Sequence, residues 1–152
     1  MSLVSLAPAF RAALFTRMTA LVTTATLVTR GDPVFDTHSD CVVIGPVSST
    51  SEVAAMGPTR PRQETLTCEV TVYSFRAGGN AQESVVEARA YELLGLLENY
   101  VRVTGTTLGV AGLQWCFLTD HRGDAATDKA VLAKGRMHVV VGTFTAAARI
   151  TS

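Results

Sequence analysis

The chain has 152 residues, of which 47% are hydrophobic and only 17% are charged. This length suffices to bury a core, and we predict a single domain over residues 1–152. Thirteen basic residues balance thirteen acidic ones, so no net charge draws the molecule to nucleic acid or to a membrane surface. Because few residues are charged, the surface must be built partly from Thr, Ser, Gly and Ala, or be partly covered by a partner.

The three cysteines, Cys41, Cys68 and Cys116, each lie in an apolar, strand-like segment. Their odd number and apolar surroundings favour buried thiols in a reducing compartment over a disulfide framework. The N-terminal apolar run has no basic region before it and is interrupted by Pro8 and Arg11. We therefore expect neither a signal peptide nor a membrane span.

A first helix is predicted from Pro8 onward, because a proline fits the first helical turn and apolar residues follow at helical spacing: Phe10, Leu14, Met18 and Leu21. The run 23–26 is rich in threonine, which predicts the end of this helix. The next apolar stretch, Asp40–Gly45, is bounded by Gly-Pro and predicts a short strand.

The stretch 64–75 alternates between apolar and polar residues. Leu66, Cys68, Val70 and Val72 fall on one face, and threonines and Glu69 fall on the other. This period of two predicts a long strand with one buried face and one wetter face.

A second helix is predicted after Gly78-Gly79, with Asn80 as its cap and Glu83 reaching back to the cap amide. Its apolar residues share one stripe: Val86, Ala90, Leu93, Leu94, Leu97 and Val101. Such a stripe is typical of a helix that lies on a sheet. Two further strands are predicted, one over 113–118 and a long one over 135–150 that contains the apolar run 137–145.

Two long loops are predicted, over about 46–62 and 120–134, because these segments are rich in Ser, Gly and Pro or in charged pairs. The element order predicts an α+β fold in two layers, with a four- to five-stranded, mostly antiparallel sheet and two helices on one face. Val139 and Val141 are expected to lie beneath these helices with Val70 and Val72. The other, threonine-rich face would be open to solvent or to another subunit.

The sequence contains few residues that indicate catalysis or metal binding. Asp36, His38 and Asp40 would share one side of an extended chain, but a metal needs three or four convergent ligands, so a polar strand edge is the better interpretation. His121 and His138 could act as general bases, yet no nucleophile stands in a recognisable setting. We therefore predict that the protein is not an enzyme and needs no cofactor or metal.

A resemblance to a known family lies in the residue order of three segments: Arg62–Phe75, Ala90–Tyr100 and Gly135–Val141. Together with the order of elements from about Arg11 onward, they resemble the tail terminator (tail completion) proteins of long-tailed bacteriophages, or siphophages. The resemblance implies a structural virion protein without catalysis. Such proteins form a hexameric ring at the head-proximal end of the tail tube, end tube polymerisation and provide the head-joining surface.

The resemblance also implies the partners: other copies of the chain, the tail tube protein and the head-closure or neck protein. DNA would pass through the ring without specific binding, and no membrane is involved. The protein would belong to the tail of a virion that is assembled in the bacterial host's cytoplasm. Two alternatives stay open. One is a neck or head-closure connector of the same virion, and the other is a small-molecule-binding α+β domain with a concave apolar pocket.

A ring of identical subunits needs two different complementary surfaces on each subunit. The second helix is acidic on its outer side and the two long connections lean basic, so opposite charges could orient neighbours. The candidate interface residues are Arg60, Arg62, Arg76, Glu87, Glu98, Arg122, Lys129 and Lys134. Reversing the charges of Arg60 and Arg62 is expected to impair tail completion and to leave subunit stability nearly unchanged.

Overall fold

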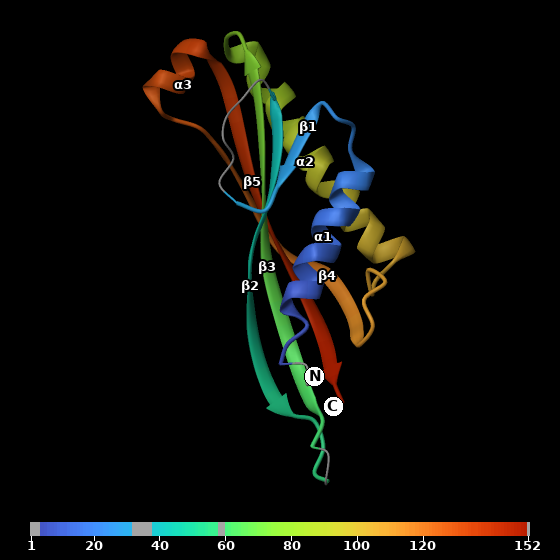
Figure 1. The fold of residues 1–152 in the computed structure, drawn as a ribbon. Helices are drawn as coiled ribbons and strands as arrows, with labels where there is room; N and C mark the ends of the chain where they lie inside the picture. Colours follow the sequence, from blue (N-terminus) through green and yellow to red (C-terminus); the bar gives the residue numbers. More distant parts are fainter. Residues whose placement is uncertain (1–3, 32–37, 58–59, 152) are drawn as a thin grey trace.

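A computed structural model of the chain describes residues 4–31, 38–57 and 60–151. Its centre is a five-stranded sheet in the order β1-β2-β3-β5-β4, with two long helices, α1 and α2, on one face (Figure 1). The strands are β1 Thr26–Thr29, β2 Asp40–Val53, β3 Arg62–Ala77, β4 Leu113–Ala125 and β5 Gly135–Ile150. The helices are α1 Ala7–Leu21, α2 Glu83–Asn99 and the short α3 Lys129–Lys134, with a 3-10 turn Asn80–Gln82 and a π-helical turn Tyr100–Thr104 flanking α2.

The sheet is mostly antiparallel, because only β1 and β2 pair in parallel. Its spine is the β3–β5 ladder, which runs from the pair Arg62–Ile150 to the pair Ala77–Gly135. The predicted fold class, a mostly antiparallel sheet with two helices on one face, is confirmed. β1 was not predicted, since the sequence analysis read only a helix end in this region.

The hydrophobic core lies between the sheet and the two long helices. The predicted inward residues of β3 and the predicted apolar stripe of α2 are all buried. Of the stripe predicted for α1, Phe10, Leu14 and Met18 are buried and Leu21 is half-buried. The fully buried side chains include Phe10, Leu14, Met18, Leu66, Val72, Leu93 and Leu97. The period of two in β3 and the helical period in α2 therefore gave the correct buried faces.

The prediction that Val139 and Val141 lie beneath the helices was wrong. The inward side chains of β5 belong to Val140 and Phe144, and Val140 stands opposite the buried Val72. A shift of one residue moves every side chain of a strand to the other face. Three consecutive valines do not alternate with polar residues. The sequence around Val140 therefore does not show which of these side chains point toward the helices.

The predicted loop over 46–62 was also wrong for about half of its length, because β2 continues to Val53. The register of β2 against β3 shifts between Ile44 and Val47, which leaves Gly45 and Pro46 as a bulge. A bulge or an edge position tolerates a proline that has no N–H to donate. A side chain at Gly45 would come within 2.6 Å of the Glu69 carbonyl oxygen, so the bulge also requires glycine.

The second predicted loop, over 120–134, is mostly ordered structure. β4 extends to Ala125, and α3 follows after a short connection. Asp128 caps α3, since its Oδ1 accepts a hydrogen bond from the Ala130 amide at 2.8 Å. α3 lies on the sheet face opposite the two long helices (Figure 1).

The predicted capping of α2 by Asn80 was wrong as well. No side-chain hydrogen bond caps the 3-10 turn or α2. Instead, Asn80 accepts a hydrogen bond from Arg136 Nη2 at 3.0 Å, and Glu83 pairs with Arg136 Nε at 3.0 Å. Both side chains therefore tie the start of α2 to β5.

We predict that Leu93→Ala lowers the free energy of unfolding by about 2–5 kcal/mol, because a fully buried leucine leaves a cavity. Urea denaturation measures this change. Val85 lies on the same helix with 46% of its surface exposed, and Val85→Ala is the matched control. The control should stay within about 0.5 kcal/mol of the wild type. Equal losses in the two variants would contradict the assigned buried face of α2.

Candidate functional site

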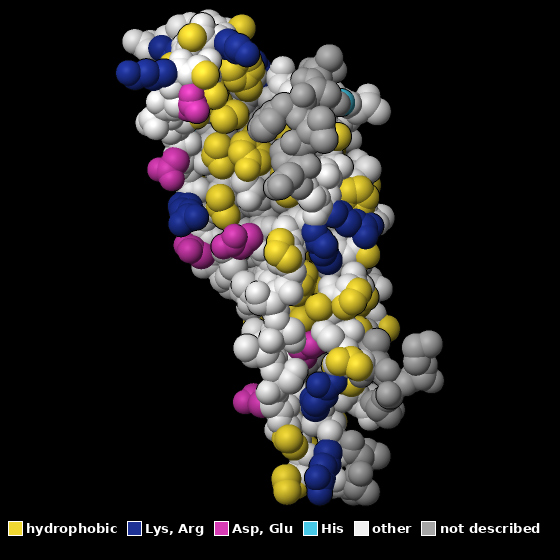
Figure 2. All heavy atoms as spheres, turned by 60° about the vertical axis from the view of Figure 1, so that its left-hand side comes forward, with side chains coloured by type: hydrophobic (Ala, Val, Ile, Leu, Met, Phe, Trp, Pro, Cys, Tyr) yellow, Lys and Arg dark blue, Asp and Glu magenta, His cyan; other side chains and the backbone are white. Residues whose placement is uncertain are grey.

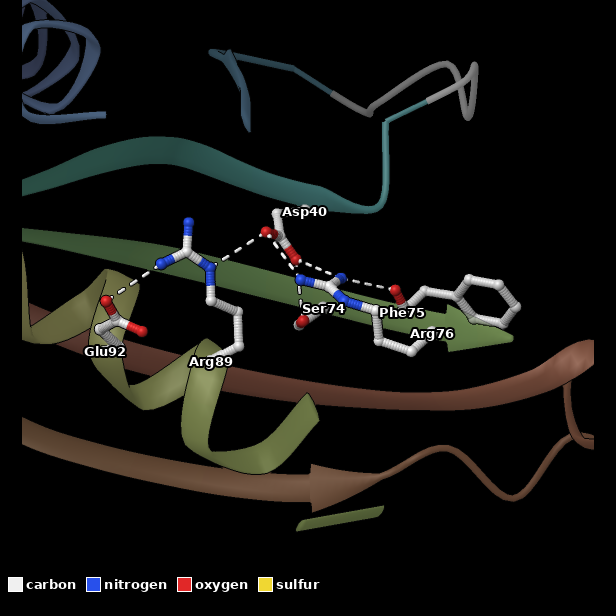
Figure 3. A network of polar contacts seen from close by, with 6 residues as sticks. All are labelled: Asp40, Ser74, Phe75, Arg76, Arg89 and Glu92. Atoms are coloured by element: carbon white, nitrogen blue, oxygen red, sulfur yellow. Dashed lines mark hydrogen bonds and ion pairs between the residues drawn. The ribbon is translucent and has the colours of Figure 1, made fainter. Parts of the chain in front are cut away.

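A buried carboxylate network joins the start of β2 to β3 and α2 (Figure 3). Asp40 Oδ1 accepts hydrogen bonds from Ser74 Oγ at 2.8 Å and from Arg76 Nη1 at 2.9 Å. Asp40 Oδ2 accepts one from Arg89 Nε at 3.1 Å, and Arg89 continues to Glu92 at 3.1 Å. The Asp40 side chain is only 8% exposed, and its two oxygens are occupied by groups of its own chain.

The electrostatics of this network favour the ionised form of the Asp40 carboxylate. Burial alone raises the pKa of Asp40, but the hydrogen bonds from Arg76, Ser74 and Arg89 outweigh it and hold the pKa below its usual value. Burial likewise lowers the pKa of Arg89, and its bonds to Asp40 and Glu92 raise the pKa above the usual value. A carboxylate held in this state acts as a structural anchor and is a poor general base.

A second buried carboxylate, Glu64 of β3, holds the start of α1. Its Oε1 accepts a hydrogen bond from the Leu6 amide at 2.9 Å. Its Oε2 accepts from Ser5 Oγ at 2.5 Å and from Ser49 Oγ at 2.6 Å. The side chain therefore serves the free N–H groups at the start of a helix that lies far away in the sequence.

Glu64 is also held as an anion. Burial raises its pKa, but the hydrogen bonds from Ser49, Ser5 and the Leu6 amide lower it below the usual value. Sequence analysis placed Glu64 at the start of a strand and missed this role. No local pattern could reveal it, because two of its partners precede it by more than fifty residues.

Asp36, His38 and Asp40, which the sequence suggests as metal ligands only weakly, do not form a described metal site. Asp36 lies outside the described residues, and Asp40 is held by Arg76 and Arg89. Within residues 4–31, 38–57 and 60–151, no group of three or more His, Cys, Asp or Glu side chains could hold a metal ion.

The two histidines considered as general bases, His121 and His138, both lie beside Tyr91 of α2. The Tyr91 ring lies 5.7 Å from the His121 ring and 6.2 Å from the His138 ring. His138 is buried, and its Nε2 has no hydrogen-bond partner in the part of the chain that the structure describes. Burial raises the pKa of the Cys68 thiol to about 11 and of the Cys116 thiol to about 12, so neither is a thiolate nucleophile near neutral pH.

The eight candidate interface residues fall into two groups. Five are exposed: Arg60, Glu87, Arg122, Lys129 and Lys134. The other three are half-buried and have partners within the subunit. Arg62 donates to the Val4 carbonyl oxygen, Arg76 binds Asp40, and Glu98 pairs with Arg102 at 2.6 Å.

Figure 2 shows basic and acidic side chains interspersed along one side of the molecule. The charged residues on that side are not gathered into one basic or one acidic region. The chain's balanced charge is thus also mixed in space there, and the exposed members of the candidate set are more suited to orienting a partner than to holding it.

The sheet face opposite the long helices is rich in threonine in its lower half. Thr65 and Thr67 of β3 stand opposite Ala147 and Thr145 of β5. On neighbouring β4, the rings of Trp115 and Phe117 stack with centroids 5.6 Å apart and stay 37% and 42% exposed. The β4 edge here is covered, because the Thr106 side chain bonds the Cys116 backbone.

A hollow lies on the same face at the other end of the sheet, beneath α3. We call it the α3 hollow, and its volume is about 280 Å³. Its lining is mostly apolar, with a few polar groups: His38, Ser39, Cys41, Tyr73, Phe75, Ala130, Val131, Lys134 and Met137. This is close to the lower size limit of a small-molecule site.

The β2–β3 hairpin ends in an exposed apolar segment, Val53–Met56, which we call the hairpin tip. Val53 is 58% exposed and Met56 is 88% exposed. The Ala54 amide donates to the Pro61 carbonyl oxygen at 2.8 Å, which closes the hairpin behind the tip. Beside it, Arg60 has a φ of 41°, a left-handed conformation that is uncommon for arginine.

No family model matches the sequence, and no curated protein matches it. Among solved structures, the fold matches a chain described as "Virion of native gene transfer agent (GTA) particle", with a TM-score of 0.67. The match covers 97% of this chain and 99% of the other, at 19% sequence identity. At this identity the likeness shows a shared fold, which extends over nearly the whole length of both chains.

None of the described helices is long and apolar enough to cross a membrane.

We predict that protonation of Glu64 and Asp40 destabilises the protein in acid. Because both folded-state pKa values are depressed, their stabilisation is present above the unfolded-state values of about 4 and is lost as the pH falls through the folded-state values. Glu64→Gln should lower the free energy of unfolding by about 1–3 kcal/mol near neutral pH and flatten its decline in acid. Urea denaturation at several pH values measures both effects.

The exposed Glu87 provides the control, since Glu87→Gln should leave the acid profile of the wild type unchanged. A Glu64→Gln profile that runs parallel to the wild-type profile would show that Glu64 does not carry this pH dependence.

Proposed function

We propose that this protein is a tail terminator, a structural virion protein that forms a hexameric ring at the head-proximal end of a tail tube. The ring ends tube polymerisation and provides the surface that joins the head. Its partners are other copies of the chain, the tube protein and the head-closure protein. DNA passes through the ring without specific binding, the protein is not an enzyme, and assembly takes place in the host cytoplasm.

The observation that carries the proposal is the full-length match in fold to a chain of a gene transfer agent virion. The likeness in fold extends over 97% of this chain and 99% of the other. The resemblance of Arg62–Phe75 and of the α2 segment to tail terminators supports the finer assignment within such a particle.

The use of the polar side chains supports a role in assembly. The two most elaborate polar networks, around Asp40 and Glu64, are directed inward and fix the helices to the sheet. The exposed features are instead apolar or mixed in charge: the hairpin tip, the Trp115–Phe117 pair and the α3 hollow. Exposed apolar groups of this kind mark surfaces that meet a partner.

The α3 hollow favours a second candidate, a small-molecule-binding domain. Its apolar lining, together with Lys134, would suit a small apolar molecule with an anionic group. A small-molecule-binding function would explain neither the full-length fold match nor the exposed hairpin tip. We therefore prefer the tail terminator.

Deletion of the gene from the particle that encodes it tests the function. We expect tubes of abnormal, variable length that do not join heads, because nothing would stop polymerisation at the correct length. Electron microscopy of the particles measures tube length and joining, and the wild-type gene supplied in trans should restore both. Tubes of normal length that fail to join heads would instead identify a neck connector. Normal particles would refute a role in assembly.

The charge-reversal experiment predicted from sequence is best made at Arg60 alone. Arg62 is bonded to Val4 and lies near Glu64, so its reversal would disturb the start of α1. We expect Arg60→Glu to reduce the yield of joined particles severalfold and to change the free energy of unfolding by no more than about 0.5 kcal/mol. Particle counts and urea denaturation measure these effects, and Arg149→Glu is the matched control, because Arg149 is exposed on β5 and is not a candidate interface residue. Wild-type yields with Arg60→Glu would exclude a role for this side chain.

A further inference from the structure

We propose that the hairpin tip of one subunit inserts into the α3 hollow of a second copy of this chain. The inference rests on the proposed ring and adds to it the contact that joins neighbouring subunits. It accounts together for the most exposed apolar segment and for the apolar hollow, which lie apart in the subunit.

The hairpin tip has the properties of an inserting element. Met56 and Val53 are 88% and 58% exposed, and Ala54 and Ala55 between them are exposed too. The tip follows a ladder in which Val53 pairs with Arg62, and the bond from the Ala54 amide to the Pro61 carbonyl oxygen closes the hairpin at its base. A preorganised apolar tip loses little conformational freedom on binding.

The α3 hollow has a matching chemistry. Tyr73, Phe75 and Met137 line it from the sheet, and Val131 lines it from α3. A volume of about 280 Å³ leaves room for aliphatic side chains such as those of Val53 and Met56. Lys134 also lines the hollow, and Glu52 directly precedes the tip, so an opposite pair of charges could orient the inserted hairpin.

The positions of the two features determine the kind of assembly. The hairpin and α3 lie at opposite ends of the elongated subunit (Figure 1). Contact between different surfaces of identical subunits is heterologous, and it forms a ring when the rotation between neighbours closes. A pair of tips would leave the hollow unfilled, and a small molecule in the hollow would leave Met56 exposed. A second copy of the chain fills the hollow and covers the tip.

Self-association of paired surface variants tests the contact. Met56→Ser should weaken association by about tenfold or more, as expected for an apolar anchor. Val103→Ser is the control, because Val103 is 65% exposed and lies in neither the tip nor the hollow. Sedimentation velocity measures association, and urea denaturation should give wild-type stability for both variants. Equal association of the two variants, or a wild-type protein that is monomeric at every concentration, would overturn the proposal.

Cross-linking identifies the partner surfaces. Met56→Cys and Ala130→Cys proteins are prepared separately, mixed and mildly oxidised. We expect a linked pair that contains one chain of each kind. The native thiols of Cys41, Cys68 and Cys116 are all buried and should not react. Links between two Met56→Cys chains, or no links, would overturn the proposal.

The two proposals fail in different ways. If the links form and Met56→Ser weakens association, but deletion of the gene gives normal particles, the contact stands and the terminator function falls. If deletion gives tubes of abnormal length, but neither the variants nor the cross-links behave as expected, the function stands and this contact falls.

Discussion

Two buried, ionised carboxylates attach the two long helices to the sheet, and the rest of the fold depends on this arrangement. Glu64 binds the start of α1, and Asp40 binds Arg89 of α2. Asp40 stands opposite Ser74, ten residues along β3 from Glu64, so the two anchors are separated by about 30 Å of strand. Between them the helices contact the sheet through apolar side chains, which give the layers cohesion but little directional information. The carboxylates supply that direction, because a buried anion is tolerated only when its donors are in place.

The sequence predicted those parts of the structure that depend on neighbouring residues. The alternation in Leu66–Val72 and the stripe through Leu93 and Leu97 gave the correct buried faces, because each pattern is contained in one element. Val140 was misassigned because consecutive valines carry no phase, and the β2 extension was missed because a bulge at Gly45-Pro46 hides a proline inside a strand. The roles of Glu64 and Asp40 depend on distant partners, and the hairpin tip and α3 hollow exist only once the chain is folded. None of these has a local signature.

The two faces of the sheet have separate tasks, and this division bears on the proposed function. The inner face is covered by helices and holds the main core, so changes there alter stability. The outer face carries threonines, the Trp115–Phe117 pair and the α3 hollow. A sheet that needs only one covered face for its stability leaves the other to evolve as a contact surface. The likeness in fold to a virion chain at 19% identity fits such a division, since the core pattern can persist while the outer residues change.

The unbroken β3–β5 ladder explains how one subunit can present different chemistry at its two ends. One end of the ladder, at Arg62, lies at the base of the β2–β3 hairpin. The other end, at Gly135, lies where β5 follows α3. The tip and the hollow therefore lie near opposite ends of the same ladder. A long hydrogen-bonded ladder between packed helices and a polar face is stiff, and the separation of its ends is therefore fixed. In the proposed ring, closure depends on the rotation between neighbours, and a fixed separation between the tip and the hollow keeps that geometry the same for every subunit. Side chains at the tip can then change how subunits meet without changing how each subunit folds.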